Sequence, residues 1–159
     1  MLTVFVPRGT VLEPHPLEAG EAIPEAAIWL DLINPTVEED KLVEQRVGVA
    51  VPTREEMQEI EISSRLYVEN GARYMTATLM SHSDTATPVT TPVSFILAGQ
   101  RLVTVRYDEP RPFAMTRHKL GRACPGNVSG QTVLLELLDA VIDRAADILE
   151  RVGAEVDQV

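Results

Sequence analysis

The chain has 159 residues, with 24 Asp or Glu against 14 Lys or Arg, and its formal net charge is −10. An apolar content of 45% and a mean hydropathy of +0.00 are typical of a folded globular domain, and the acidic balance disfavours nucleic acid as a partner. No apolar run approaches the roughly 18 residues that a membrane helix needs, and residues 1–6 are too short and too poor in basic residues for a signal peptide. We therefore expect one soluble, cytoplasmic domain.

The reactive side chains argue against an enzyme. Cys124 is the only cysteine, which excludes an intrachain disulfide and any multi-cysteine metal site. The histidines, His15, His82 and His118, share no spacing that would place them on one metal-binding face. No phosphate-binding glycine loop and no Gly-x-Ser-x-Gly nucleophile motif occurs. We expect no catalytic residues.

Short strands open the chain. Apolar, strand-like runs predict strands over 2–6 and 27–32, and residues 10–12 are expected to pair back on the first strand. Residues 13–25 contain three prolines and one glycine, so we expect a loop there.

Two acidic helices follow. Thr36 and Glu39 have the spacing of a capping box, and Gly48 is a suitable stop, so a helix is predicted between Thr36 and Gly48. Thr53 and Glu56 repeat the capping pattern and predict the start of a second helix.

Two hairpins come next. Strand-like runs over 65–69 and 72–82 flank an Asn-Gly pair, the strongest short hairpin signal. Residues 92–107 alternate apolar side chains around a Gly-containing turn, with further apolar groups on the opposite face. We expect this second hairpin to lie inside a sheet that is covered on both sides.

Helices are predicted over 113–122 and 131–159. The second carries a heptad seam of Leu134, Leu138, Val141, Ala145, Ile148 and Val152. We expect its first half to pack on the domain, and we divide the chain into a core, 1–130, and the start of a long helix, 131–159. Because this helix has no stop signal at its end, we expect the native protein to continue.

Two acidic arrays are the candidate binding sites. Glu55, Glu56 and Glu59 belong to the second predicted helix, where Glu55 and Glu59 would share a face. A second ladder on the long helix consists of Asp139, Asp143, Asp147 and Glu150. Carboxylates suit Mg²⁺, but a solvated helix face is the favoured explanation of each array.

The stretch Trp29–Asp40, WLDLINPTVEED, resembles the N-terminal cytoplasmic domain of the CorA family of divalent-cation transporters, which includes the ZntB group. In that family a strand with Trp and Asp runs into an acidic helix. The positions that fit are Trp29, Asp31, Asn34, Pro35, Thr36, Glu38 and Glu39. The resemblance continues in order through 52–60, 65–80, the hairpin 93–106 and the helix 134–152.

The resemblance implies an α/β fold in which a mixed, largely antiparallel sheet lies between two helical layers (α/β/α) and ends in a long C-terminal helix. It also implies a homopentamer in the intact protein, with these domains forming a funnel on the cytoplasmic side of the inner membrane. A regulatory Mg²⁺ or Co²⁺ ion bound between neighbouring domains would hold the pore shut. In that family an acid in the short helix near Glu56 pairs with an acid on the following stalk, and Glu55, Glu56 or Glu59 could serve as the helix acid here.

We therefore expect the regulatory, non-catalytic domain of a Mg²⁺/Co²⁺ transporter, truncated before its membrane helices and its Gly-Met-Asn pore motif. A ZntB-like transporter of Zn²⁺ or Ni²⁺ is the nearest alternative. A stand-alone interaction module that dimerises through the heptad seam is another. A hydrolase with paired carboxylates is disfavoured, because general acid catalysis needs a carboxyl in a pocket and these acids lie on exposed helices.

Overall fold

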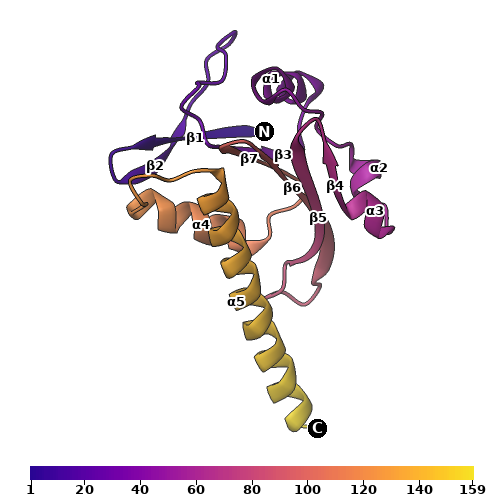
Figure 1. Ribbon diagram of the computed structural model, residues 1–159. Coiled ribbons are helices and arrows are strands. Elements are labelled where there is room, and N and C mark those ends of the chain that lie inside the picture. Colours follow the sequence, from indigo (N-terminus) through magenta and orange to yellow (C-terminus); the bar gives the residue numbers. More distant parts are fainter.

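The computed structural model describes residues 1–159 and centres on one seven-stranded sheet, in the order β2-β1-β3-β7-β6-β5-β4 (Figure 1). All neighbours are antiparallel except β3 and β7, which are parallel. The strands are β1 (Leu2–Arg8), β2 (Val11–His15), β3 (Trp29–Ile33), β4 (Leu66–Glu69), β5 (Ala72–Ser81), β6 (Val89–Ala98) and β7 (Arg101–Arg106). The sheet is therefore mixed and largely antiparallel.

Helices cover both faces of this sheet. The helices are α1 (Val37–Val47), α2 (Arg54–Met57), α3 (Ile62–Arg65), α4 (Arg111–Arg122) and α5 (Gly130–Asp157). The three short helices α1 to α3 lie on one face, and α4 and α5 lie on the other (Figure 1). The predicted α/β/α architecture with a long last helix is confirmed.

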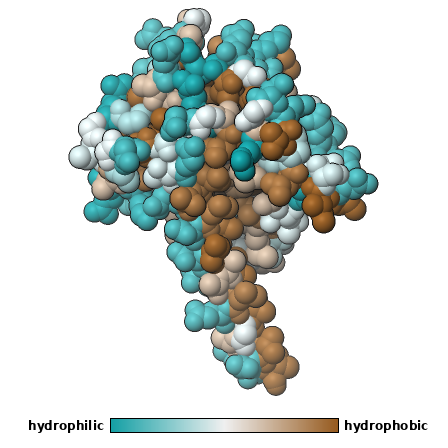
Figure 2. All heavy atoms as spheres, in the orientation of Figure 1, coloured by the Kyte–Doolittle hydropathy of each residue, from teal (hydrophilic) through white to brown (hydrophobic).

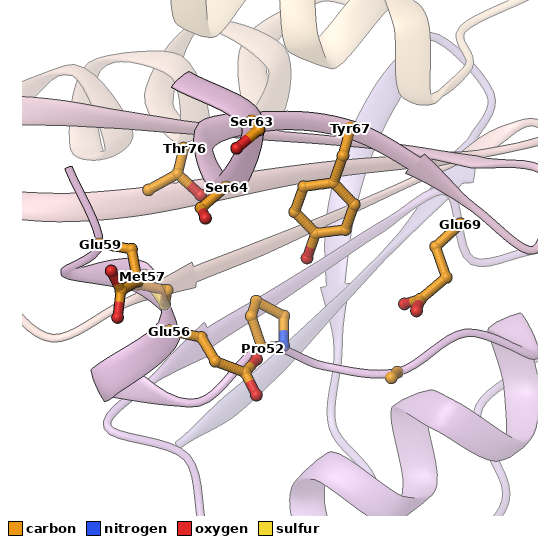
Figure 3. A pocket seen from close by; sticks show the side chains of 10 residues that line it. Pro52, Glu56, Met57, Glu59, Ser63, Ser64, Tyr67, Glu69 and Thr76 are labelled. Carbon is orange, nitrogen blue, oxygen red and sulfur yellow. The ribbon is translucent and has the colours of Figure 1, made fainter. Parts of the chain in front are cut away.

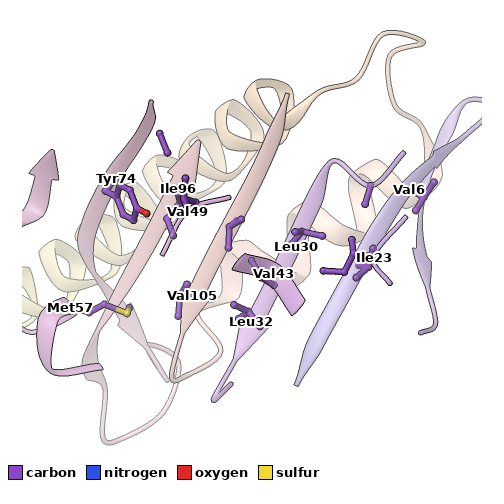
Figure 4. Close-up of a cluster of buried hydrophobic side chains, with 14 residues drawn as sticks. Val6, Ile23, Leu30, Leu32, Val43, Val49, Met57, Tyr74, Ile96 and Val105 are labelled. Carbon is purple, nitrogen blue, oxygen red and sulfur yellow. The ribbon is translucent and has the colours of Figure 1, made fainter. Parts of the chain in front are cut away.

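A cluster of 14 buried residues fills each side of the sheet. Strand β3 shows how the sequence produces both clusters, because successive side chains of a strand point to opposite faces. Leu30 and Leu32 lie in the cluster under α1 and α2, whereas Trp29 lies in the cluster under α4 and α5. Figure 4 shows the first cluster, with Val43 of α1 and Met57 of α2 over the strands.

The two predicted hairpins are confirmed. Asn70 and Gly71 both have positive φ, 50° and 79°, which is the geometry of a tight type I′ turn between β4 and β5. Ala98 pairs with Arg101, so Gly99, with φ of 59°, opens the two-residue turn between β6 and β7.

Both predicted capping boxes are also present. In α1, Thr36 Oγ1 accepts from the Glu39 N–H at 3.2 Å, and Glu39 Oε1 accepts from the Thr36 N–H at 3.0 Å. Gly48 closes α1 in the left-handed conformation. In α2, Thr53 and Glu56 form the same reciprocal pair, with both distances 3.2 Å.

Two local predictions were wrong. Residues 13–15 belong to strand β2, although prolines predicted a loop there. The strand tolerates Pro14 because β2 is an edge strand and has a partner on one side only. Arg65 ends a one-turn helix, α3, and β4 begins one residue later than predicted. This turn has no capping side chain and no buried residue, so no capping motif or apolar period marks it in the sequence.

Only the first turns of α5 are buried, at Val133, Leu134 and Leu137. Beyond that point the predicted seam is only partly covered, because Val141 packs against the core cluster whereas Leu138 and Val152 are 38% and 47% exposed. The helix extends past the edge of the sheet, as Figure 1 shows, and there it carries an exposed apolar stripe. The stripe consists of Leu135, Leu138, Ile142, Ala145, Leu149, Val152 and Val156.

Hydrogen bonds at its start and its middle help to attach α5 to the rest of the domain. At its start, the Gly130 N–H donates to the Gln100 carbonyl at 2.7 Å, and a Cβ at Gly130 would lie 2.5 Å from the Arg101 backbone. In the middle of the helix, Arg144 donates from Nε and Nη2 to Ser83 Oγ, at 3.1 and 2.7 Å.

None of the helices combines the length and the apolar character needed to cross a membrane.

Candidate metal-binding site

A polar pocket lies beside the predicted acidic helix, between α2, α3 and the strands β4 and β5. Its volume is about 460 Å³, and its walls carry the carboxylates of Glu56, Glu59 and Glu69. Figure 3 shows Glu56 and Glu59 at one end of the pocket, Glu69 at the other and Tyr67 between them. Hydroxyl groups of Ser63, Ser64 and Thr76 complete the polar lining.

The local sequence explains where these acids lie. The α2 capping box orients Glu56, because one of its carboxylate oxygens accepts the Thr53 N–H. Helix α2 ends at Met57, whose side chain is buried in the core and fixes the turn to the sheet. Glu59 therefore follows the helix and reaches the pocket from the connecting segment.

The structure brings only part of the predicted acidic set together. Glu56 and Glu59 line one pocket, but Glu55 does not. Glu55 and Glu59 do not share a helix face as predicted, because the helix stops before Glu59. Glu55 lies toward Tyr107 instead, where burial and then the charges of Asp40 and Glu55 raise the pKa of that tyrosine, against the Arg54 charge.

Tyr67 lines the pocket, and its ring stacks on that of the buried Tyr74. The rings of Tyr67 and Tyr74 are 4.6 Å apart between centroids, and the Tyr74 hydroxyl donates to the Ala50 carbonyl at 2.6 Å. Burial raises the pKa of Tyr74 to about 12, and nearby acids add to the shift. Both phenols therefore stay protonated at neutral pH, and the carboxylates provide the anionic oxygens of this pocket.

The oxygen donors suit a hard cation such as Mg²⁺, which prefers carboxylates and water. No group of three or more His, Cys, Asp or Glu side chains in the chain is arranged to hold a metal ion. The second predicted array, Asp139, Asp143, Asp147 and Glu150, is exposed on α5 and faces no cavity as a set. The chain by itself thus presents acidic oxygens without a complete coordination shell.

A second cluster, on the opposite face of the sheet, was not predicted as a unit. Asp31 of β3 is completely buried and accepts from Arg106 at two points, Nε to Oδ1 at 3.1 Å and Nη2 to Oδ2 at 2.8 Å. It also accepts from Thr104 Oγ1 at 2.7 Å and from Arg117 of α4. The Trp29 indole N–H donates to the same Thr104 hydroxyl at 3.0 Å.

This Asp31 cluster positions α4 on the sheet. Phe113 of α4 lies under the Arg106 guanidinium, 4.2 Å from ring centroid to Cζ, while Arg117 reaches Asp31 from one turn further along the helix. The family motif drew attention to Trp29 and Asp31 in the sequence. Their partners Thr104 and Arg106 lie 75 positions later in the sequence, and no local pattern connects them.

Comparison with known proteins decides the family. The family described as CorA-like Mg²⁺ transporter protein matches residues 24–159, which is most of the chain. The chain belongs to the CorA-like Mg²⁺ transporter family. The resemblance carried by the Trp29–Asp40 stretch is thereby confirmed.

Magnesium transport proteins named CorA match this chain at low sequence identity. The magnesium transport protein CorA of Haemophilus influenzae is 26% identical over 133 residues, covering 84% of this chain and 42% of that protein. Its counterpart in Escherichia coli K12 is 25% identical over 144 residues, covering 90% and 46%. The chain spans less than half the length of these relatives.

Solved structures show the same CorA fold. The soluble domain of CorA from Methanocaldococcus jannaschii superposes with a TM-score of 0.72 at 16% identity, over 99% of this chain and 62% of that one. The full-length CmaX protein gives a TM-score of 0.68 at 14% identity, over 99% and 49%. The seven-stranded sheet, its helical layers and the long last helix are thus shared by distant sequences.

Proposed function

We propose that this chain is the cytoplasmic regulatory domain of a longer transporter that carries Mg²⁺ and Co²⁺, and that it controls the pore by sensing these ions. The observation that supports this best is the family match over residues 24–159, together with relatives named as magnesium transport proteins. The domain makes and breaks no covalent bonds in this role. Its work is to favour one arrangement of the assembly when a divalent ion is bound.

The acidic pocket is the proposed sensor. Glu56 and Glu59 supply anionic oxygens from one side, and Glu55 adds an exposed carboxylate on α2. A Mg²⁺ or Co²⁺ ion needs further ligands, which we assign to waters and to a neighbouring copy in a homopentamer. Binding between copies would link the ion to the closed arrangement, because removing it leaves carboxylates of two subunits facing each other.

The experiment uses the intact transporter and limited proteolysis in the presence and absence of Mg²⁺ or Co²⁺, at physiological ionic strength. We expect both ions to slow cleavage, because bound ions hold the cytoplasmic domains together. Equal cleavage with and without metal would contradict a sensing role. Uptake assays with Mg²⁺, Co²⁺ and Zn²⁺ identify the transported ion separately.

Two variants test the assignment of the acids. Glu56→Gln removes the charge but keeps the α2 capping box, because Gln also serves at this position. We expect Glu56→Gln and Glu59→Gln to raise the Mg²⁺ concentration needed for protection. Glu38→Gln, an exposed acid on α1, is the matched control and should leave that concentration unchanged. Protection that is the same in all three variants would exclude this pocket as the sensor.

A further inference from the structure

The loop between β5 and β6, residues 82–88, holds the middle of α5 through one serine. Ser83 accepts with its hydroxyl from Arg144 at 3.1 and 2.7 Å, and with its carbonyl from Arg151. Figure 2 shows the second half of α5 projecting from the body of the molecule. Between residues 140 and 157, the hydrogen bonds from α5 to the rest of the domain all go to Ser83. The position of this loop therefore affects how firmly that half of the helix is held.

A histidine beside this serine ties the loop to the end of β7. His82 Nε2 lies 3.2 Å from Asp108 Oδ1, and Ser81 Oγ donates to the same oxygen at 3.0 Å. The His82 carbonyl accepts the Thr85 N–H at 3.1 Å and the Thr85 hydroxyl at 2.7 Å, which folds the loop into a turn. Because Ser81, His82 and Ser83 are consecutive, one short segment contacts both β7 and α5.

Asp108 is a fixed anion at the far end of this contact. Its carboxylate accepts the Glu109 N–H at 2.7 Å, and its backbone carbonyl accepts Nη1 of the buried Arg106 at 3.0 Å. Burial acts to raise the pKa of Asp108, but hydrogen bonds from Glu109 and Ser81 and the charge of His82 lower it overall. The carboxylate therefore stays ionised at and above about pH 5.

The other charged groups on the elements around this segment are carboxylates and guanidinium groups. They are Asp84 of the loop, Arg106 and Glu109 at the end of β7, Arg111 of α4, and Asp143, Arg144, Asp147, Glu150 and Arg151 of α5. Asp84 pairs with Arg111 at 3.5 Å, and the three acids of α5 are exposed. Groups of these two kinds ordinarily titrate outside the range of about pH 5 to 8, in which an imidazole gains or loses its charge. His82 is thus the member of this segment that responds to pH near neutrality.

We propose that residues 81–83 form a proton-sensitive clasp, in which the protonated His82 holds the β5–β6 loop against Asp108 and thereby holds the middle of α5 through Ser83. The protonated imidazole carries a charge opposite to that of Asp108, whereas the neutral ring keeps at most a hydrogen bond. The clasp is therefore firmest in mild acid and loosens as the pH rises through the range of the imidazole.

The size of the effect follows from the exposure of the pair. The side chains of His82 and Asp108 are 54% and 27% exposed, so water screens their attraction. We expect the charge to change the opening equilibrium of the loop by about two- to fivefold. This inference does not depend on the proposed transport function, because none of these residues lines the acidic pocket.

The test measures hydrogen exchange of the 159-residue chain at pH 5.5 and pH 8, with each amide rate divided by its intrinsic rate at the same pH. We expect the amides of residues 141–152 to open about two- to fivefold more readily at pH 8. The amides of β3 and β7 serve as the internal reference and should not change in this way. Equal protection of residues 141–152 at both pH values would overturn the proposal.

His82→Asn should abolish this pH dependence and leave residues 141–152 as open at pH 5.5 as they are at pH 8. Asparagine also tolerates the positive φ of 55° at this position, so the turn is not strained. His118→Gln, at an exposed histidine of α4, and His15→Gln, at a histidine of the edge strand β2, should keep the pH dependence of the parent chain. Persistence of the pH dependence in His82→Asn, or its loss in His118→Gln or His15→Gln, would refute the assignment to His82.

Two further variants test the two contacts of the clasp. Asp108→Asn keeps an oxygen for the Ser81 hydroxyl but removes the charge, so it should also abolish the pH dependence. The double variant Ser83→Ala with Arg151→Gln removes the contacts to α5. In that variant the pH dependence should remain in residues 82–87 and disappear from residues 141–152. If the helix keeps its pH dependence there, the proton acts on α5 by another route and the proposal fails.

Discussion

Asp31 and Arg106 form a two-point ion pair in which the side chains are only 0% and 2% exposed. This pair joins β3 to β7, the parallel strands at the centre of the sheet. A buried charge is tolerated because its partners satisfy it, and Asp31 also meets Thr104 and Arg117. The pair therefore matters most when one member is removed.

Asp31→Asn should lower the free energy of unfolding by about 3–5 kcal/mol, because Arg106 would remain buried without its counter-charge. Urea unfolding followed by the fluorescence of Trp29, which belongs to the same cluster, measures the change. Asp139→Asn, on the exposed face of α5, is the matched control and should stay within about 0.5 kcal/mol of the parent chain. A loss below 1 kcal/mol for Asp31→Asn would show that the pair is dispensable.

Gly130→Ala should destabilise the domain by about 1–3 kcal/mol, because the new Cβ would meet backbone atoms of Arg101 and Leu102 at 2.5 Å. Gly153→Ala is the ideal comparison, since it lies in the same helix with open space around it. That change should stabilise by about 0.5–1 kcal/mol through helix propensity. Thermal unfolding of both variants decides the point, and equal effects would mean that α5 can shift away from the strand.

Ser83→Ala should loosen the middle of α5 without unfolding the sheet. The substitution removes the hydroxyl that accepts two N–H groups of Arg144, at a cost of about 1–2 kcal/mol. Hydrogen exchange should then speed up around residues 141–152 and stay unchanged in the central strands. Thr87→Ala, in the same loop but exposed, should leave exchange as it is. Faster exchange throughout the domain would argue against a local attachment.

Asp40→Asn should stabilise the domain at neutral pH. Burial, and then the charges of Glu44 and Glu39, raise the pKa of Asp40 above its ordinary value. The folded state therefore binds this proton more tightly than the unfolded state, so the ionised carboxylate costs stability above its pKa and the cost vanishes as the pH falls below about 4. We expect a gain of roughly 0.5 kcal/mol at pH 7 and none at pH 3.5. A gain that does not depend on pH would assign the effect to something other than charge.

Sequence reasoning recovered features whose signals are local. The capping boxes at Thr36 and Thr53 and the Asn70-Gly71 turn each depend on residues within four positions of one another, and all three are present. The fold class followed from these elements and from the family resemblance. Their local character is the reason that a single sequence was sufficient.

Features that depend on distant residues were beyond such reasoning. The buried pairs of Asp31 need the parallel register of β3 with β7, which apolar alternation does not specify. Heptad spacing predicted an apolar face along α5, but it does not specify where the sheet beneath that face ends and the exposed stripe begins. Glu55 and Glu59 do not share a helix face, because α2 ends at Met57.

The parallel pairing of β3 with β7 has a consequence for how the protein is made. Trp29 aligns with Leu102 and Ile33 with Arg106, so the middle of the sheet joins segments that leave the ribosome far apart in time. Until residue 106 has emerged, β3 lacks a neighbour on one side and its apolar faces are open to other nascent chains. We expect productive folding to wait for the β6–β7 hairpin, and the early N-terminal third to be the part of the chain that most needs chaperone protection.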